Sequence, residues 1–446
     1  MPFYIKILDK RLSFLAIIHF IIGFLISSRK DLATFWAFAI FFYGILNIIR
    51  YRNRNDEASI FASYIVGMEV ALRTVGASVL WEFGKYATIF LLVTGMVVEN
   101  VKFLRINILS LIYFIALLPA VALLPEYIDF RTFRLMVSGN LSGPLCLFIS
   151  FLYFRQRKFN ELNITNVFRT LILPIISSIG LIFVRAPSIQ NLTFSSEANF
   201  EMSGGFGPNQ VSTLLGVSLI IVSLSRMFNL KIFPRQIYDY VFLTISIGTA
   251  VLTFARGGVI APIIAIFFSY LLSGGVKKYK FRYNGMGYVL IVFLGLSYFS
   301  SNFTKGLINT RYSSLLSVIN PNQTTLSGRA HIMALDFQIF KDNFLMGVGP
   351  GAARDLRWRY GYGSVVGAHS EFTRMLAEHG LFGLISLLSI LLLSYQEYRK
   401  RLDYNKVLLG CLSLFSILTM FHSAFRIALP GFIYGLSYVI LNFQKK

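Results

Sequence analysis

Apolar segments of membrane-spanning length alternate with short polar connectors along the whole chain. Each apolar segment runs for roughly 17–25 residues, enough for a helix to cross a hydrocarbon layer of about 30 Å. The pattern predicts an all-α, polytopic membrane protein with about 12–14 transmembrane helices. The predicted spans are 12–28, 32–49, 58–80, 83–98, 106–124, 135–154, 167–185, 211–225, 237–254, 257–273, 285–300, 369–395, 407–424 and 427–443.

One long polar interruption, 301–368, breaks this alternation between two apolar segments. It predicts a three-part chain. The parts are an N-terminal transmembrane bundle of about 11 helices (1–300), a loop segment of short amphipathic helices (301–368) and C-terminal transmembrane helices (369–446).

Composition and charge agree with a membrane protein. Hydrophobic residues make up 55% of the chain and charged residues 14%, which excludes an ordinary soluble domain of this size. The net charge is +22, but the basic residues are scattered through connectors, so we expect a lipid bilayer and no nucleic acid as partner. With a cytoplasmic N-terminus, most basic residues fall in cytoplasmic connectors, whereas 186–210 contains none. Both termini are therefore predicted to be cytoplasmic, with 301–368 facing outward.

Arg256 lies at the outward tip of a tight hairpin, where the positive-inside rule disfavours a basic residue. Gly257 and Gly258 permit the sharp turn. The planar guanidinium suits capture of a phosphate or diphosphate, and snorkelling to lipid phosphates is the structural alternative. By contrast, Glu69 and Arg73 are four residues apart on one helix and are expected to neutralise each other as an ion pair.

A helix is predicted at about 329–341, within the outward segment, starting from a Ser-Gly-Arg turn that ends in Arg329. Ile332, Leu335 and Ile339 share one face of it, which predicts a helix on the membrane surface. Free backbone N–H groups at a helix N-terminus favour anions, and Arg329 would add to such a site. Arginine and aromatic residues follow the helix, in a mixture that suits sugar stacking and diphosphate contact and equally suits a headgroup-level belt. They are Arg354, Arg357, Trp358, Arg359, Tyr360 and Tyr362.

His369 opens the span 369–395 at the outer interface and is followed by Glu371, Arg374 and Glu378. Charges in the first turns of a membrane helix are costly unless they face a polar cavity. We therefore predict a functional role for His369 rather than a structural one.

No metal-binding or nucleotide-binding motif accompanies these residues. The sequence has no Asp-x-Asp pair, no His-Glu-x-x-His and no P-loop. Cys146 and Cys411 both fall inside predicted helices, so neither a disulfide nor a thiolate metal site is expected. We expect neither metal nor cofactor, and expect arginines to supply the charge neutralisation that a metal would otherwise give.

In order and spacing, these residues resemble the bacterial O-antigen ligase and O-antigen polymerase family. The likeness covers roughly 250–385, and the N-terminal half is similar only in being polytopic and apolar. Ser370 stands where family members often have asparagine, and Ala255 where they have serine. The motifs are Thr253-Phe254-Ala255-Arg256-Gly257-Gly258; the run from Gly328-Arg329 through Asp342-Asn343-Phe344-Leu345-Met346-Gly347-Val348-Gly349; and His369-Ser370-Glu371-Phe372 followed by Leu376-Ala377-Glu378-His379-Gly380-Leu381-Phe382-Gly383.

The resemblance implies an inverting, metal-independent glycosyltransferase at the periplasmic face of the bacterial inner membrane. It would move glycan from an undecaprenyl-diphosphate-linked oligosaccharide to a sugar hydroxyl of an acceptor glycan. On this hypothesis Arg256 and Arg329 bind the diphosphate, and His369 is the general base. The expected substrate-binding residues are Arg354, Arg357, Arg359, Trp358, Glu371 and Arg374.

Polymerase and ligase share this chemistry and differ in the acceptor. We favour an O-antigen polymerase, which accepts another lipid-linked repeat unit, because of the two departures above. The alternative is an O-antigen ligase, which accepts the lipid A core. A flippase for lipid-linked oligosaccharide is a third hypothesis, but it predicts repeat symmetry, and the sequence shows no convincing internal repeat. A chain-length regulator protein is left open as a partner.

Overall fold

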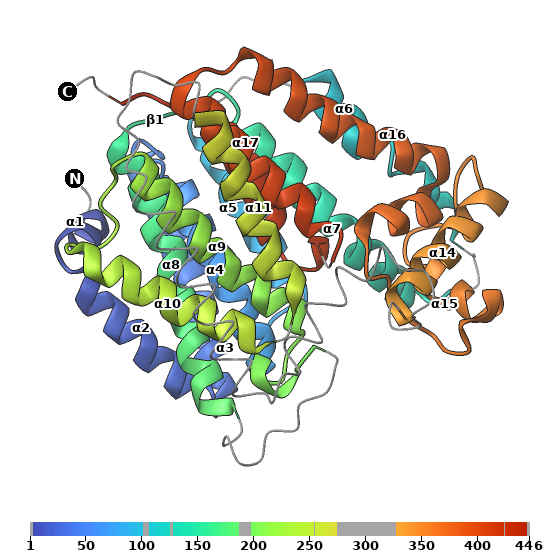
Figure 1. Cartoon of the computed structure of the whole chain (residues 1–446), viewed down its shortest axis with the longest axis horizontal. Coiled ribbons are helices and arrows are strands. Elements are labelled where there is room, and N and C mark those ends of the chain that lie inside the picture. Colours follow the sequence, from blue (N-terminus) through green and yellow to red (C-terminus); the bar gives the residue numbers. More distant parts are fainter. Residues whose placement is uncertain are drawn as a thin grey trace.

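The computed structural model describes residues 3–100, 107–124, 128–186, 198–253, 255–273, 327–422 and 424–443, and these are helical almost throughout (Figure 1). The predicted span 285–300 and the start of the outward segment lie outside the described residues. The α-helices are α1 (Phe3–Lys10), α2 (Leu12–Ile26), α3 (Lys30–Tyr51), α4 (Glu57–Val75), α5 (Phe83–Val98), α6 (Ile108–Ile115), α7 (Phe130–Phe154), α8 (Glu161–Arg185), α9 (Pro208–Met227), α10 (Gln236–Leu252), α11 (Arg256–Ser273), α14 (Ser327–Asp342), α15 (Ala353–Arg357), α16 (Glu371–Lys400), α17 (Asp403–Thr419) and α18 (Leu429–Leu436). Shorter elements are the 3-10 turns η2 (Pro119–Leu123), η4 (Glu201–Ser203) and η8 (Ala424–Arg426), the π-helical turn η7 (Trp358–Tyr362), and the strands β1 (Lys158–Phe159) and β2 (Ile440–Leu441).

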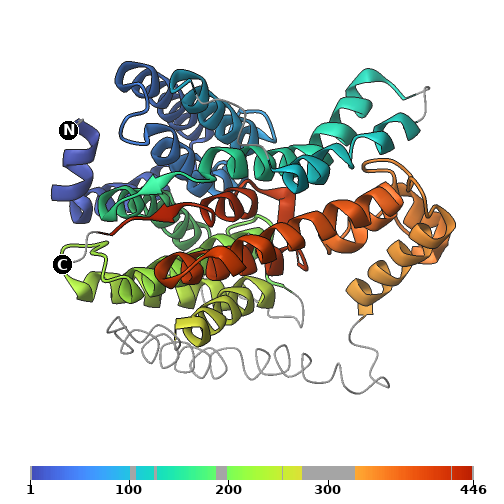
Figure 2. The ribbon, with the colours of Figure 1, turned by 90° about the horizontal axis from the view of Figure 1, so that it is seen from above.

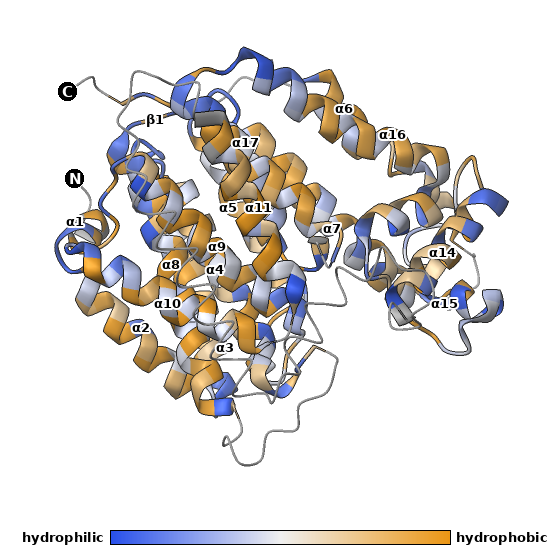
Figure 3. Cartoon of the chain, viewed as in Figure 1, coloured by the Kyte–Doolittle hydropathy of each residue, from blue (hydrophilic) through white to orange (hydrophobic). Residues whose placement is uncertain are grey.

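The helices confirm the all-α, polytopic membrane class. Within the described residues, six helices are long and apolar enough to cross a membrane: α3, α4, α7, α8, α9 and α16. Shorter apolar helices, including α2, α5, α10 and α11, accompany them. Hydrophobic residues cover these helices over most of their length, and hydrophilic residues gather toward their ends (Figure 3). The chain is a multi-pass membrane protein, and its exact number of spans stays a prediction.

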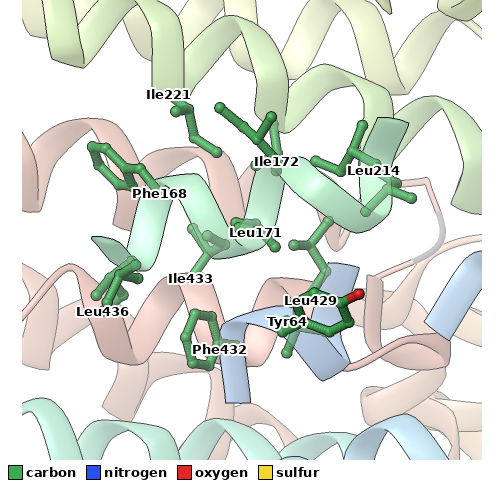
Figure 4. Packing of buried hydrophobic residues seen from close by; sticks show 14 of the residues in the cluster. Tyr64, Phe168, Leu171, Ile172, Leu214, Ile221, Leu429, Phe432, Ile433 and Leu436 are labelled. Carbon is green, nitrogen blue, oxygen red and sulfur yellow. The ribbon is translucent and has the colours of Figure 1, made fainter. Parts of the chain in front are cut away.

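Helix α8 lies at the centre of the bundle, between α2, α4 and α9. Phe168, Leu171 and Ile172 from α8 pack with Leu214 from α9 and Leu429 from α18 in one buried cluster (Figure 4). Helices pack this closely in a membrane where small residues let backbones approach. Gly23 on α2 is such a residue, because a Cβ there would lie 2.0 Å from the Ser177 carbonyl oxygen of α8.

The prediction that 427–443 forms one membrane-spanning helix is wrong. Only Leu429–Leu436 is α-helical, and the chain then turns into β2, which pairs with β1. Residues 427–439 are buried throughout, and Gly431 and Gly435 allow close packing against α7. Non-helical backbone is tolerated at membrane depth when protein rather than lipid surrounds it. Burial therefore explains why an apolar segment of spanning length does not form a spanning helix.

The prediction that the helix 329–341 lies on the membrane surface is also wrong. Helix α14 starts at Ser327, as the sequence indicated, but its Ile332, Leu335 and Ile339 are buried. They face protein because α14 packs against α16. The apolar stripe that suggested a lipid contact is a packing surface, and both kinds of contact produce the same periodicity.

A break at Gly380 divides α16 into an outer and an inner part. Gly380 has φ 59° and ψ −137°, a backbone conformation that is essentially restricted to glycine. The turn after α14 fits into this break, where Val348 N–H donates to the Ala377 carbonyl (3.1 Å) and Leu381 N–H to the Phe344 carbonyl (2.7 Å). Two views place α14 and α15 at the end of the molecule opposite α1 and β1 (Figures 1 and 2).

Candidate functional site

A cavity of about 650 Å³ lies next to α15 and the start of α16, where Arg354, Arg357 and Arg374 help to line it. Its walls come from segments far apart in the sequence: the α4–α5 turn, the middle of α7, the segment before α9, the chain from α15 to α16, and η8. All of these segments lie in, or next to, connectors that the sequence assigns to the outward side. By contrast, Arg52, Arg155 and Lys158 from connectors assigned to the inner side line a different pocket. The folding of the chain therefore keeps the two predicted sets of connectors apart.

His369 lines the cavity and is half-buried. Burial lowers the pKa of its imidazole to about 4, and the positive charges of Arg329, Arg426 and Arg357 act in the same direction. The ring is therefore neutral at neutral pH, with a nitrogen lone pair available to accept a proton.

Arg329 lies near enough to His369 for its charge to act on the imidazole, and Arg256 acts in the same way on Arg329, but neither arginine is among the residues that line the cavity. Arg329 acts electrostatically on His369, and its own pKa is lowered by burial and then by the charge of Arg256. Its Nη2 donates to Asn209 Oδ1 at the start of α9 (3.4 Å). Arg256 begins α11, and the next residue, Gly257, passes so close to the His422 ring that a Cβ would meet it at 2.4 Å. The structure thus brings the three predicted catalytic residues into one neighbourhood.

Arg374 is buried in an ion-pair network on the outer part of α16. Its guanidinium pairs with Glu371 and with Glu378 (2.5 Å), and it donates to Asn140 Oδ1 of α7 (2.6 Å). All four side chains line the cavity. The charges near the start of this helix therefore do face a polar cavity, as their cost in a membrane requires.

Arg357 is also buried, and it pairs with Asp336 of α14 (2.6 Å). It donates to the Val366 carbonyl (2.8 Å), while Thr373 of α16 donates to the second oxygen of Asp336 (2.8 Å). This contact joins α14, α16 and the chain between them, directly before His369. Of the other residues predicted to bind substrate, Arg354 lines the cavity, whereas Trp358 and Arg359 are exposed and lie outside its lining.

Replacing Arg357 by alanine is expected to lower the free energy of unfolding by about 3–5 kcal/mol, because it leaves Asp336 buried without its charge partner. Thermal unfolding of the detergent-purified protein would measure this. The double variant Asp336→Leu/Arg357→Met should recover much of the stability. If the double variant is stable and fully active, Arg357 acts through the fold. A stable but inactive double variant would show instead that Arg357 contacts substrate.

Arg426 lines the cavity and is absent from the residues predicted from sequence. Its Nη2 donates to the Ala368 carbonyl (2.6 Å), next to His369. Two side chains of the N-terminal half hold its segment, because Lys85 donates to the Phe425 carbonyl (3.1 Å) and Glu69 accepts from Ala428 N–H (2.6 Å). The sequence did contain a signal for Arg426. It lies in the predicted outward connector between the last two predicted spans, where, as for Arg256, the positive-inside rule disfavours a basic residue.

The expected Glu69–Arg73 ion pair is present (2.6 Å), and Glu82 extends it. Cys146 and Cys411 are both free and buried. Within the described ranges no group of three or more His, Cys, Asp or Glu side chains is arranged to hold a metal ion, and the metal-independence of the reaction stays a prediction.

The fold and the cavity define a multi-pass membrane protein with a polar, arginine-rich site at one end. Residues 241–388 match the family model described as O-antigen ligase. This stretch runs from α10 to α16 and contains Arg256, Arg329 and His369, which belong to the motifs that resemble the O-antigen ligase and polymerase family. No curated protein matches the chain.

Proposed function

We propose that this protein transfers glycan from an undecaprenyl-diphosphate-linked donor to a sugar hydroxyl at the periplasmic face of the inner membrane. One observation carries the proposal: a histidine that lines a polar cavity, within reach of the charge of Arg329, which is itself within reach of that of Arg256, inside a segment that matches the O-antigen ligase family. These groups provide a proton acceptor and two fixed positive charges close together. A sugar hydroxyl that attacks a lipid diphosphate requires both.

In the proposed reaction, His369 removes the proton from the acceptor hydroxyl as its oxygen bonds to the anomeric carbon of the donor. The bond between that carbon and the diphosphate oxygen breaks, and the diphosphate leaves with the bonding electrons. Arg256 and Arg329 stabilise the negative charge that builds up on it. The single displacement inverts the anomeric centre. Lipid diphosphate is a good leaving group, so the reaction draws on neither a metal nor a strong general acid from the protein.

We favour polymerisation, with a second lipid-linked repeat unit as the acceptor. The description of the matched family, O-antigen ligase, makes ligation to the lipid A core the second candidate. Both reactions use the same residues and differ only in what enters the cavity as acceptor. Orientation with both termini in the cytoplasm, and a chain-length regulator as partner, belong to the same proposal.

A gel of surface glycan from a strain lacking this gene, read beside its extracted lipid-linked glycans, tests the proposal. Core capped by a single repeat unit indicates a polymerase. Uncapped core with long polymer left on the lipid carrier indicates a ligase. Single repeat units trapped on the cytoplasmic side would overturn both and indicate a flippase.

A further inference from the structure

Part of the cavity wall comes from the N-terminal half, outside the segment that matches the family. Trp81, from the α4–α5 turn, and Phe206, from the segment before α9, both line the cavity. Their rings meet edge to face with centroids 6.4 Å apart. Trp81 is 61% exposed despite its size. An exposed indole beside a half-buried phenyl ring in a cavity of this kind calls for an occupant.

The charges behind these rings are balanced. The Arg73 guanidinium lies 5.0 Å from the Trp81 ring centroid and pairs with both Glu69 (2.6 Å) and Glu82 (3.3 Å). Lys85, fully buried, pairs with Glu82 as well. Two positive and two negative groups therefore neutralise one another, so this wall offers little attraction to a phosphate. Other lining residues are different, because Arg354 and Arg426 belong to no ion pair among the described residues and line the cavity together with His369.

Polar side chains accompany the aromatic rings. Gln210 of α9 and the Glu82 carboxylate line the same wall. An acyl chain would cover these groups without hydrogen-bonding to them, which is unfavourable. A sugar ring fits both features, because its C–H face packs on an aromatic ring while its hydroxyls reach amide and carboxylate groups. A wall that combines aromatic rings with a few fixed polar groups is typical of sites for small organic ligands.

We propose that Trp81 and Phe206 form a carbohydrate subsite, which binds sugar rings of the transferred or accepting glycan while Arg256 and Arg329 take the diphosphate. The inference rests on the proposed function and deepens it. The N-terminal half, which the family match does not include, then selects the glycan, and the matched segment performs the transfer.

Steady-state transfer by the purified full-length protein tests the subsite. Trp81→Ala is expected to raise KM for one glycan substrate roughly five- to tenfold, the scale of one ring contact, with kcat little changed. Varying donor and acceptor separately identifies which glycan occupies the subsite. With a donor or acceptor that carries a single sugar, the KM effect should disappear. Phe206→Ala should give a smaller change in the same substrate.

Trp358 provides the comparison, since it is an exposed tryptophan (58%) that the sequence suggested for sugar stacking but that lies outside the cavity lining. A Trp358→Ala variant with the larger KM effect would overturn the subsite at Trp81. A Trp81→Ala variant with the same KM values as the parent protein would also overturn the subsite.

Binding can also be measured without turnover, through tryptophan fluorescence. The chain has three tryptophans, and Trp36 is buried against Tyr64 with its indole N–H donating to the tyrosine oxygen (3.0 Å). In a Trp358→Phe background, the repeat-unit oligosaccharide released from the strain's own surface glycan should change the emission of Trp81. The change should vanish in Trp81→Phe/Trp358→Phe. No change in the first protein, or the same change in both, would overturn the subsite. If Trp81 proves not to bind glycan but the protein still transfers it, only the subsite is refuted and the proposed function stands. If the protein binds glycan at Trp81 but transfers none, only the proposed function is refuted.

Discussion

Replacing His369 by alanine is expected to lower kcat by about 10²–10⁴-fold, the usual contribution of a positioned general base. The variant should fold, because His369 is only half-buried and lines a cavity. Glycan transfer by purified protein in detergent or liposomes, with a defined lipid-linked donor, measures the effect. His331 supplies the control, since it is exposed and stacks on Tyr362 on the same outward side. Activity retained by His369→Ala at the level of His331→Ala would refute the general-base role.

The pH dependence of kcat/KM provides a second measure of His369. A general base works in its neutral form, so activity falls as pH drops through its pKa. Because burial and nearby arginines lower the pKa of His369 to about 4, the acid limb of the free enzyme should lie near pH 4 rather than at the ordinary value of 6.5. Bound diphosphate would neutralise part of the arginine charge, so the limb of kcat should lie at higher pH than that of kcat/KM. An acid limb of kcat/KM at about 6.5 would contradict the buried, arginine-flanked histidine.

Replacing Arg329 by alanine is expected to lower kcat by roughly 10²–10³-fold, the cost of removing one fixed donor to a developing negative charge. Arg329→Lys should recover only part of the rate, because an ammonium group keeps the charge but loses the planar fork. The same assay measures both. Arg134, an exposed arginine near the start of α7, is the matched control for a change of charge on the outward side.

A second property distinguishes loss of charge from loss of fold in this series. Removing Arg329 should also raise the pKa of His369, because the positive charge of Arg329 is one of the causes that lower it. The acid limb of the residual kcat/KM should therefore shift to higher pH in Arg329→Ala. If rate and acid limb both stay at their parental values, Arg329 does not act on the reacting groups.

The sequence was sufficient for the membrane class, because span length is a local signal. The outward position of the site-forming connectors, which rests on the basic-residue bias, stays a prediction. The sequence also singled out His369 and Arg329, which the structure brings together. It did not indicate Trp81 or Phe206 as cavity residues. An exposed aromatic residue near a membrane boundary has an ordinary explanation in the headgroup belt, and only the packing of α4, α5 and α9 shows that these two face a cavity.

The sequence also did not reveal which buried charged side chains pair with each other. Arg357 and Asp336 are 21 residues apart, and nothing in their local pattern shows that one neutralises the other. Two predictions failed for a related reason: that the helix 329–341 lies on the membrane surface, and that 427–443 is one helical span. A hydrophobic pattern reports that a face is apolar but does not reveal whether lipid or protein covers it.

The course of the chain after η8 has a consequence for assembly. Residues 427–441 follow every other described helix, so they are synthesised after the helices that they pack between. Most of those helices can enter a bilayer singly, since each satisfies its own backbone hydrogen bonds. The segment from Leu429 to Leu441 is only partly helical and cannot, because its turn and strand need protein partners. It has to enter a groove that the earlier helices have already formed. Arg426, at the head of this segment, therefore reaches the Ala368 carbonyl, next to His369, only after this step, and the cavity that it lines stays incomplete until then.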